Sequence, residues 1–410
     1  MKSYIPRPLY TKRIEPFIDK EVIKVITGQR RTGKSYILLQ ISDMIKKERP
    51  EANIIFVDKE QLAFAAIKNY MDLYQYVLKM TAGHSYNYLF VDEIQEIEDF
   101  QLCLRSLLNE NKCDIYCTGS NAKMLSGELA THLAGRYIEF PVHSLSYEEF
   151  LTFNRRQDSS ESLRLYLTFG GMPYIHNLAM ETNVIFEYLR NVYSTILLKD
   201  VVAREAIRNV SFLENLVAYL IDNTGSLFSA QNISKYLKSQ QVNIPTQTIL
   251  NYLRALCNSF FVYKIQRAET QGMKIFEIGE KYYFEDLGLH NAIRHFDFRK
   301  DINKLMENVV CIDLLRFGYE VYVGKYGNKE IDFIASKNDH RIYIQVTYML
   351  SDDSTVQREF GNLLDNYPKY VVTMDEMQSG GNYQGIKQIS LRDFLLAEDK
   401  ENIRRSLTSL

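Results

Sequence analysis

The sequence predicts an α/β fold whose first 150 residues form a parallel sheet with helices on both faces. Two observations indicate it: short apolar runs alternate with helical stretches, and a glycine-rich loop joins the first run to the first helix. Strands buried on both faces read as continuous apolar runs, as is typical of parallel sheets. The runs are Val22–Thr27, Asn53–Asp58, Tyr88–Asp92, Asp114–Thr118 and Tyr137–Val142, and the helical stretches are Lys34–Lys46, Gln61–Met80 and Asp99–Asn109.

Length and composition indicate several globular domains. The chain has 410 residues, of which 46% are hydrophobic and 24% charged, which excludes wholesale disorder. The net charge is −2, so no global positive field drives the whole chain onto nucleic acid. We find no run of about 18 apolar residues, as a membrane span requires, and no apolar signal-peptide stretch. With five scattered cysteines and no Cys-x-x-Cys pair, we expect a cytoplasmic protein with reduced cysteines.

The strand pattern stops near residue 144, and residues 144–222 read as helices with a break at Gly170-Gly171-Met172-Pro173. Three helices and two strands then follow in the order of a winged helix-turn-helix: Ser211–Asn223, Ala230–Lys238, Thr246–Asn258, Phe260–Ile265 and Lys274–Ile278. The tail again mixes a helix with strands, at Ile302–Phe317, Glu320–Val323, Glu330–Ala335, Arg341–Val346 and Tyr370–Thr373. The predicted domains are a core over 1–150, a helical lid over 151–210, a winged helix over 211–299 and an α/β domain over 300–410.

The glycine-rich loop matches G-x-x-x-x-G-K-[ST] at every fixed position and lies between a strand and a helix, as that motif requires. Its glycines let backbone N–H groups face phosphate oxygens at a helix N-terminus, while the lysine reaches the β- and γ-phosphates and the serine ligates Mg²⁺. We therefore predict ATP and Mg²⁺ as cofactors, bound by Gly28, Gln29, Arg30, Arg31, Thr32, Gly33, Lys34 and Ser35.

Polar residues at the ends of later strands complete the predicted site. Asp92 and Glu93 end an apolar strand, where ligands collect in open α/β sheets. We expect Asp92 to hold Mg²⁺ and Glu93 to polarise the attacking water. The polar groups of Thr118-Gly119-Ser120-Asn121, with Asn121 as the catalytic candidate, sense the γ-phosphate or orient that water, unless this segment is a simple turn and helix N-cap. Arg136 either reaches a γ-phosphate on a neighbouring subunit of a homo-oligomer or pairs with Glu139 or Glu128 at the surface.

With these motifs the sequence resembles, over nearly its whole length, a family of bacterial and archaeal P-loop ATPases. Their AAA+-type core is followed by a C-terminal domain of unknown function (DUF4143). Besides the motifs above, Gly170-Gly171-Met172-Pro173 and Leu198-Lys199-Asp200-Val201-Val202 carry the likeness. The resemblance implies a core sheet of order 5-1-4-3-2, a helical lid, a winged helix and a restriction-endonuclease-like tail. It also implies ATP binding and hydrolysis, with no settled substrate.

The tail looks like PD-(D/E)xK nucleases, in which an Asp and a Glu or Gln bind Mg²⁺ and a lysine assists the attacking water. Asp332 and Gln345 match the two ligands, and Glu307 lies in the preceding helix. The lysine position is Thr347, which supplies no cation for the developing charge. We therefore favour a degenerate site in a nuclease-like scaffold over an active nuclease, although Lys325 or Lys329 could substitute for the missing lysine.

The winged helix raises DNA as a partner. Thr246, Gln247, Asn251 and Arg254 could face a major groove, and Lys264 and Arg267 could flank it. Residues 229–258 carry only three basic residues, so affinity should be modest and salt-sensitive. We predict an ATPase whose nucleotide cycle moves the winged-helix and nuclease-like modules, with DNA as a candidate partner. The alternatives are a nucleotide-regulated protein-binding switch with little turnover and an ATP-regulated nuclease.

Overall fold

The computed structural model divides into two compact units, one of Met1–His143 with Asn258–Phe260 and one of Ser144–Cys257 with Phe261–Leu410. Each is described by itself. The structure describes residues 4–122, 133, 135–203, 205, 207–239, 241–270, 272–275, 279–294, 298–327, 329–350, 360, 366–377, 379–383, 385–397 and 400. None of the helices among them is long and apolar enough to cross a membrane.

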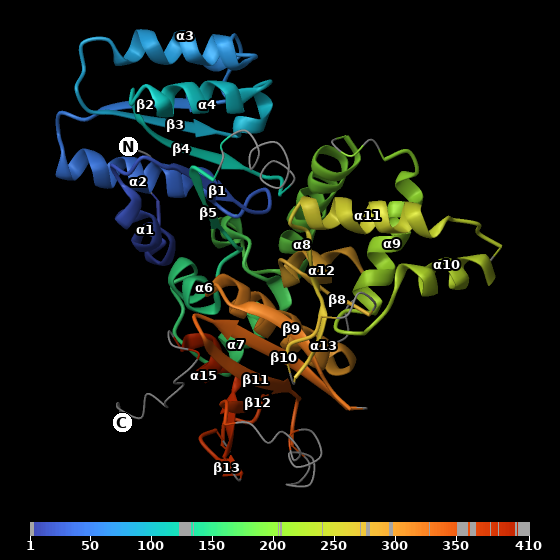
Figure 1. Ribbon diagram of the computed structural model, residues 1–410. Helices are drawn as coiled ribbons and strands as arrows, with labels where there is room; N and C mark the ends of the chain where they lie inside the picture. Colours follow the sequence, from blue (N-terminus) through green and yellow to red (C-terminus); the bar gives the residue numbers. More distant parts are fainter. Residues whose placement is uncertain are drawn as a thin grey trace. The chain divides into compact units, whose positions relative to one another are not determined.

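The first unit contains a five-stranded parallel sheet of order β2-β3-β4-β1-β5 (Figure 1). This is the order 5-1-4-3-2 that the family resemblance implies, so that prediction is confirmed. All five strands were predicted to within two residues at each end. They are β1 (Ile23–Thr27), β2 (Asn53–Asp58), β3 (Asn87–Asp92), β4 (Asp114–Gly119) and β5 (Tyr137–Pro141).

Helices cover both faces of this sheet (Figure 1). The helices α1 (Pro8–Ile14) and α2 (Lys34–Glu48) share one apolar core with the sheet, and α3 (Tyr70–Thr81) and α4 (Phe100–Asn109) share another. Each core takes alternate side chains of β1, since Ile26 lies in the first and Val25 in the second. Short 3-10 turns lie at Glu15–Phe17, Leu62–Phe64 and Ile94–Glu96.

One helix of the first unit was predicted wrongly. The stretch Gln61–Met80 contains a 3-10 turn followed by α3, which begins only at Tyr70. The Asn69 side chain accepts hydrogen bonds from the backbone N–H groups of Met71 and Asp72, and the Asp72 carboxylate bonds back to the N–H of Asn69. This capping box fixes the start of the helix.

The second unit begins with helices, as predicted. They are α6 (Tyr147–Phe153), α7 (Ser160–Phe169), the 3-10 turn Pro173–Asn177, α8 (Thr182–Thr195), a π-helix (Ile196–Ala203), α9 (Val210–Asp222), α10 (Ala230–Ser239) and α11 (Thr246–Asn258). The strand β6 (Val262–Ile265) then pairs antiparallel with β8 (Lys281–Phe284), which α12 (Leu287–Ile293) follows.

The strand β6 thus pairs with β8 and not with the second wing strand predicted at Lys274–Ile278, in which Ile275 forms an antiparallel bridge with Ala268. Residues 276–278 of that stretch lie outside the described residues. The strand β7 (Arg267–Glu269) lies between β6 and β8 in the sequence but belongs to the sheet of the tail, where it pairs parallel with β9 (Glu320–Tyr326).

The tail forms a seven-stranded mixed sheet of order β13-β14-β12-β11-β10-β9-β7. The long helix α13 (Phe298–Arg316) precedes it and α15 (Leu391–Leu396) follows it. The remaining strands are β9 (Glu320–Tyr326), β10 (Lys329–Lys337), β11 (His340–Val346), β12 (Lys369–Thr373), β13 (Asn382–Tyr383) and β14 (Ile386–Ser390). The helix and the first four strands were predicted from the sequence, whereas β13, β14 and α15 were not.

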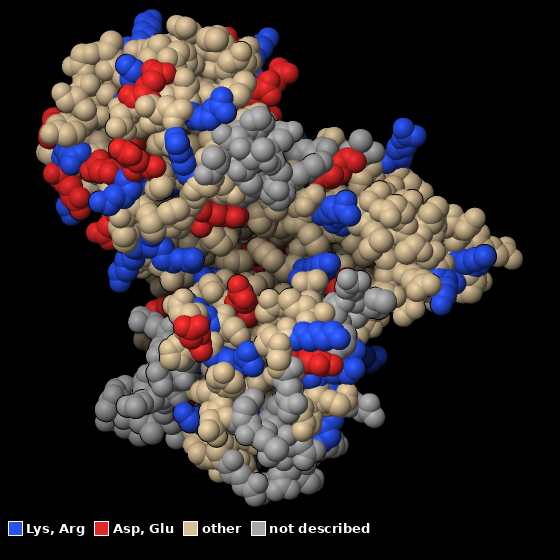
Figure 2. Space-filling view, in the orientation of Figure 1, with Lys and Arg blue, Asp and Glu red and all other residues tan. Residues whose placement is uncertain are grey.

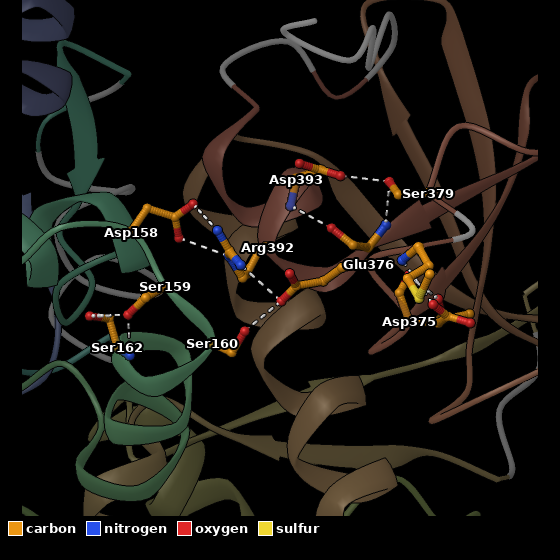
Figure 3. Close-up of polar contacts among 12 residues, drawn as sticks. Asp158, Ser159, Ser160, Ser162, Asp375, Glu376, Ser379, Arg392 and Asp393 are labelled. Atoms are coloured by element: carbon orange, nitrogen blue, oxygen red, sulfur yellow. Dashed lines mark hydrogen bonds and ion pairs between the residues drawn. The ribbon is translucent and has the colours of Figure 1, made fainter. Parts of the chain in front are cut away.

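The helices α6 and α7 share an apolar core with this sheet and with α13 and α15. A polar cluster adds to that contact, and its side chains point toward one another in Figure 3. Arg392 of α15 donates from Nε to Asp158, at 3.0 Å, and its Nη1 lies 2.8 Å from Glu376. The Ser160 hydroxyl donates to the same Glu376 carboxylate at 2.8 Å. Asp158 and the start of α7 are thus tied to α15 and to Glu376.

Candidate functional site

The loop between β1 and α2 has the backbone shape that the phosphate-binding motif predicts. Gly28 (φ 138°), Arg31 (φ 68°) and Gly33 (φ 96°) all lie in the left-handed region. A Cβ at Gly28 would lie 2.1 Å from the carbonyl oxygen of Val142, so only glycine fits there. The loop ends at the first residue of the 15-residue helix α2, whose N-terminus supplies free N–H groups and a partial positive charge.

Lys34 lies inside this loop rather than in solvent. Its ammonium donates to the carbonyl oxygens of Gly28 and Gln29, at 3.0 and 2.9 Å, and its side chain is buried. Gln29 is also buried, and neither polar atom of its amide has a hydrogen-bond partner among the described residues. A buried amide without partners costs free energy unless a ligand or water supplies them. The loop residues therefore fit a polar ligand such as the phosphates of a nucleotide.

Asp92 and Glu93 meet this loop at the end of β3. The Thr118 hydroxyl of β4 donates to Asp92 at 2.5 Å and accepts from the backbone N–H of Glu93 at 2.8 Å. Ser35 hydrogen-bonds to the same Asp92 carboxylate. Burial raises the pKa of Asp92 above its usual range, against the lowering effect of the Ser35 and Thr118 hydrogen bonds. The predicted Mg²⁺ ligands Ser35 and Asp92 therefore lie together.

The Glu93 carboxylate accepts hydrogen bonds from the Ser120 hydroxyl, at 3.2 Å, and from the Gln95 amide. Glu93 has a left-handed backbone (φ 53°), which is uncommon for a residue with a side chain and recurs at functional sites. Two residues of the Thr118–Asn121 segment contact Glu93, since Ser120 donates to its carboxylate and Thr118 accepts its backbone N–H. Asn121, the next residue after Ser120, is also buried.

The other predicted site residues lie farther from the loop interior. Arg30 forms an exposed ion pair with Glu60 at 3.4 Å. Arg136 is exposed and donates to Asn109. Its expected surface partner Glu139 accepts a hydrogen bond from Thr27 at 2.6 Å, and Glu128 lies outside the described residues.

Arg7, a residue that the sequence analysis did not single out, hydrogen-bonds to the backbone of the loop. Arg7 is 2% exposed and donates to the carbonyl oxygens of Thr32, at 2.7 Å, and His143, at 3.0 Å. Its backbone N–H donates to the Gln40 side chain of α2 at 2.9 Å. Arg7 thus ties the loop to α2 and to the chain that leaves β5. No local motif marks it, because the two carbonyls that it binds lie 25 and 136 residues away.

In the tail, two of the predicted site residues, Glu307 and Asp332, lie beside the same lysine, Lys281. The ammonium of Lys281, from β8, lies 2.8 Å from Glu307, 2.8 Å from Glu330 and 3.6 Å from Asp332. Burial and the negative charge of Glu307 raise the pKa of Asp332 to about 8, against the opposing effect of Lys281. Sequence analysis missed Lys281 because no element was predicted over its strand β8 and because it lies 51 residues before Asp332.

The two remaining predicted residues do not complete a metal site. The Gln345 carbonyl accepts the backbone N–H of Asp332 at 3.2 Å, and the Thr347 hydroxyl donates to the carbonyl of Met349 at 3.3 Å. Among the described residues, no group of three or more His, Cys, Asp or Glu side chains is arranged to hold a metal ion. The residues of the tail therefore do not fit the Mg²⁺ that the nuclease resemblance implies.

Comparison with known proteins gives matches to domain families and relatives of nearly full length. Residues 20–151 match the AAA domain family, and residues 160–300 match a domain of unknown function (DUF8612). An uncharacterized protein of Haemophilus influenzae is 35% identical over 405 residues, covering 96% of this chain and 99% of that protein. The uncharacterized protein MJ1544 of Methanocaldococcus jannaschii is 30% identical over 345 residues, covering 80% and 75%.

Among solved structures, the chain is similar to the Orc1 protein of Aeropyrum pernix in complex with DNA, with 10% identity and a TM-score of 0.31. That match covers 73% of this chain and 95% of the other. A likeness of this size carries no argument about what this chain binds. The DUF4143 label suggested by the sequence stays a prediction.

Proposed function

Because the chain belongs to the family of AAA-domain proteins that includes these relatives from Haemophilus influenzae and Methanocaldococcus jannaschii, we propose that it binds Mg²⁺–ATP and hydrolyses it. The observation that carries the proposal is the loop Gly28–Ser35, with its buried lysine and the unpartnered amide of Gln29, next to the paired acids Asp92 and Glu93.

Each residue has a separate role in this proposal. Bound Mg²⁺ neutralises charge on the phosphates, and Ser35 and Asp92 would hold it. Lys34 leaves the carbonyls of Gly28 and Gln29 for the phosphates when nucleotide enters. Glu93 orients the attacking water after its carboxylate is released from Ser120 or Gln95. Arg136 would act on the γ-phosphate of a neighbouring subunit, which requires a homo-oligomer. We also propose that the protein is cytoplasmic.

Titration calorimetry with ATP and Mg²⁺ tests the binding part. Lys34→Ala should abolish tight binding, because the β- and γ-phosphates lose their main cationic partner. The matched control is Lys47→Ala, an exposed lysine on the same helix α2, which should bind as the unchanged protein does. Equal affinity of the Lys34 variant and the control would contradict the assignment of the loop.

DNA is a second candidate partner, and one observation favours it. Residues 223–268 contain five basic residues, Lys235, Lys238, Arg254, Lys264 and Arg267, and no Asp or Glu. Figure 2 shows the surface over α10 in basic and uncharged residues. A pocket of about 500 Å³ beside α11 is lined by Arg208, Asn251 and Arg254, together with one carboxylate, Glu205. The segment 223–268 itself has cations and amides without carboxylates, which suits a phosphate backbone.

Fluorescence polarisation with a labelled DNA duplex at several salt concentrations tests this candidate. Arg254→Ala should weaken binding and reduce the salt dependence by about one released counterion. Lys47→Ala again serves as the control for the loss of one positive charge elsewhere. Absence of binding at low salt, or binding that Arg254→Ala leaves unchanged, would remove DNA from the account.

The tail completes the proposal. We assign it a nuclease-like fold that serves as a scaffold, with Glu307, Asp332, Gln345 and Thr347 as a degenerate site. What supports this is the mixed sheet with Asp332 and Gln345 on adjacent strands, and the threonine at the lysine position.

A further inference from the structure

Three carboxylates of the tail surround one lysine that comes from outside it in the sequence. Lys281 lies on β8, whereas Glu307 lies on α13 and Glu330 and Asp332 lie on β10. The lysine side chain is 3% exposed, and its ammonium contacts Glu307 and Glu330 at 2.8 Å each. Asp332 lies 3.6 Å away and is 11% exposed. All three ion pairs are therefore largely or partly removed from water.

One oxygen of each of two of these carboxylates already accepts a hydrogen bond. Glu307 accepts from the Tyr283 hydroxyl and from Lys281 with the same oxygen, Oε1. Its Oε2 lies close to Gly225, where an added Cβ would be only 2.9 Å from it. Asp332 accepts the backbone N–H of Val346 at 2.8 Å. These contacts fix both carboxylates around the ammonium.

A divalent cation in this position would need the same oxygens. Mg²⁺ and Ca²⁺ bind carboxylate oxygens at about 2.0–2.6 Å, so a metal bridging Glu307 and Asp332 would lie within contact distance of the ammonium. Two cations that close repel strongly in a poorly hydrated interior. The ammonium is part of the chain and remains beside the carboxylates when the protein folds, whereas a metal must lose bound water to enter.

We propose that Lys281 is the resident cation of this cluster: its ammonium takes the place of a divalent metal, so the cluster binds no metal and instead joins β8 to α13 and β10. The proposal does not depend on the ATP site, which lies on other residues.

The test counts Mn²⁺ ions bound to the full chain by electron paramagnetic resonance, without nucleotide. The unchanged protein and Asp332→Asn should bind the same number, because the cluster holds none. Lys281→Met keeps the length of the side chain and removes its charge, and should add one Mn²⁺ site. Adding Asp332→Asn to Lys281→Met should remove that site. The matched control is Lys264→Met on the paired strand β6, where an exposed lysine faces Glu280 at 3.5 Å.

Two results would overturn the proposal. The first is an Mn²⁺ site in the unchanged protein that Asp332→Asn removes, since the cluster would then hold metal with the lysine in place. The second is a folded Lys281→Met protein that gains no site. If Lys281→Met does not fold, the comparison of the unchanged protein with Asp332→Asn decides the question alone: equal numbers support the proposal, and one ion fewer overturns it.

Discussion

Two buried cationic side chains, Arg7 and Lys281, each hold together segments that lie far apart in the chain. Arg7 bonds to carbonyls of the phosphate-binding loop and of residue 143, and Lys281 bonds to carboxylates on α13 and β10. Long flexible side chains are seldom buried without such partners, because desolvation of the charge is costly. Removing either one leaves polar groups in the interior without partners.

Replacement of Arg7 should therefore weaken nucleotide binding, although Arg7 is not one of the residues proposed to contact the nucleotide. In Arg7→Ala the buried carbonyl of Thr32 loses its donor, which costs about 1–3 kcal/mol, and the loop is no longer tied to residue 143. We expect the Kd for ATP to rise about tenfold or more and the melting temperature to fall. The control for both measurements is Lys12→Ala, which replaces an exposed lysine of α1, the helix that directly follows Arg7. A lower melting temperature with an unchanged Kd would make Arg7 a purely stabilising residue.

Sequence analysis located the loop residues because the motif is local: eight consecutive residues carry the chemistry, and their strand and helix flank them directly. It could not locate Arg7 or Lys281 in their roles. Each acts through a partner on another element, and only the folded chain brings them together. Asp92 and Glu93 were found for an intermediate reason, since the carboxyl ends of parallel strands meet at one edge.

At the scale of elements, the bounds of a helix or strand were predicted correctly where the local sequence pattern alone determines them. The central strands β1, β3 and β4 are buried on both faces and have no competing pattern, so their bounds were predicted closely. The helix α3 was placed too early because apolar residues at 62–67 extend its pattern, while the capping box at Asn69 sets its start. The strand β8 was missed because it begins with Lys281, and a charged residue does not indicate a buried strand. Lys281 is buried because it pairs with carboxylates such as Glu307.

The Arg392 cluster between α15 and the start of α7 offers a prediction at this scale. Arg392→Lys keeps the charge but loses the two-pronged contact with Asp158 and the bond to Glu376. The pairs are partly exposed, so the loss should be about 1 kcal/mol and should lower the melting temperature by a few degrees. Arg294→Lys, in a more exposed pair with Asp222, is the control and should have little effect. Equal shifts in the two variants would show that the cluster adds no stability.

At the scale of the whole molecule, Asp286 should make stability depend on pH. Its carboxylate is buried and accepts the N–H groups of Gly171, at 2.7 Å, and Leu289, at 3.0 Å, which ties the glycine break after α7 to the start of α12. Burial raises the pKa of Asp286 to about 6, against the effect of these hydrogen bonds. Between about pH 4 and pH 6 the folded protein holds a proton that the unfolded chain has released, so this contribution to stability falls as pH rises.

Melting temperatures of the unchanged protein and Asp286→Asn across that pH window measure the effect. The variant has no ionisable group at this position, so the difference between the two proteins should shift in favour of the variant as pH rises from 4 to 6. A difference that does not change with pH would mean that Asp286 keeps an ordinary pKa in the folded protein.

The tail gives a second prediction for the whole protein. Plasmid and branched DNA should remain uncut with Mg²⁺ or Mn²⁺, with or without ATP, because Thr347 supplies no cation and Lys281 is held by three carboxylates. Thr347→Lys is the variant in which weak cutting could arise, and Asp332→Ala in that background should remove it. Metal-dependent cutting by the unchanged protein that is lost in Asp332→Ala and in Lys281→Met would instead make Lys281 the lysine of an active nuclease.

The central claim is that the acids at the end of β3 make the protein an ATPase and not only an ATP-binding protein. Release of inorganic phosphate from ATP and Mg²⁺, measured for the unchanged protein and Glu93→Gln at saturating ATP, tests it most directly. Lys34, Ser35 and Asp92 are intact in the variant, so binding should persist while turnover falls by roughly 10²–10⁴. Hydrolysis at the same rate in both proteins, or none in the unchanged protein, would contradict the account.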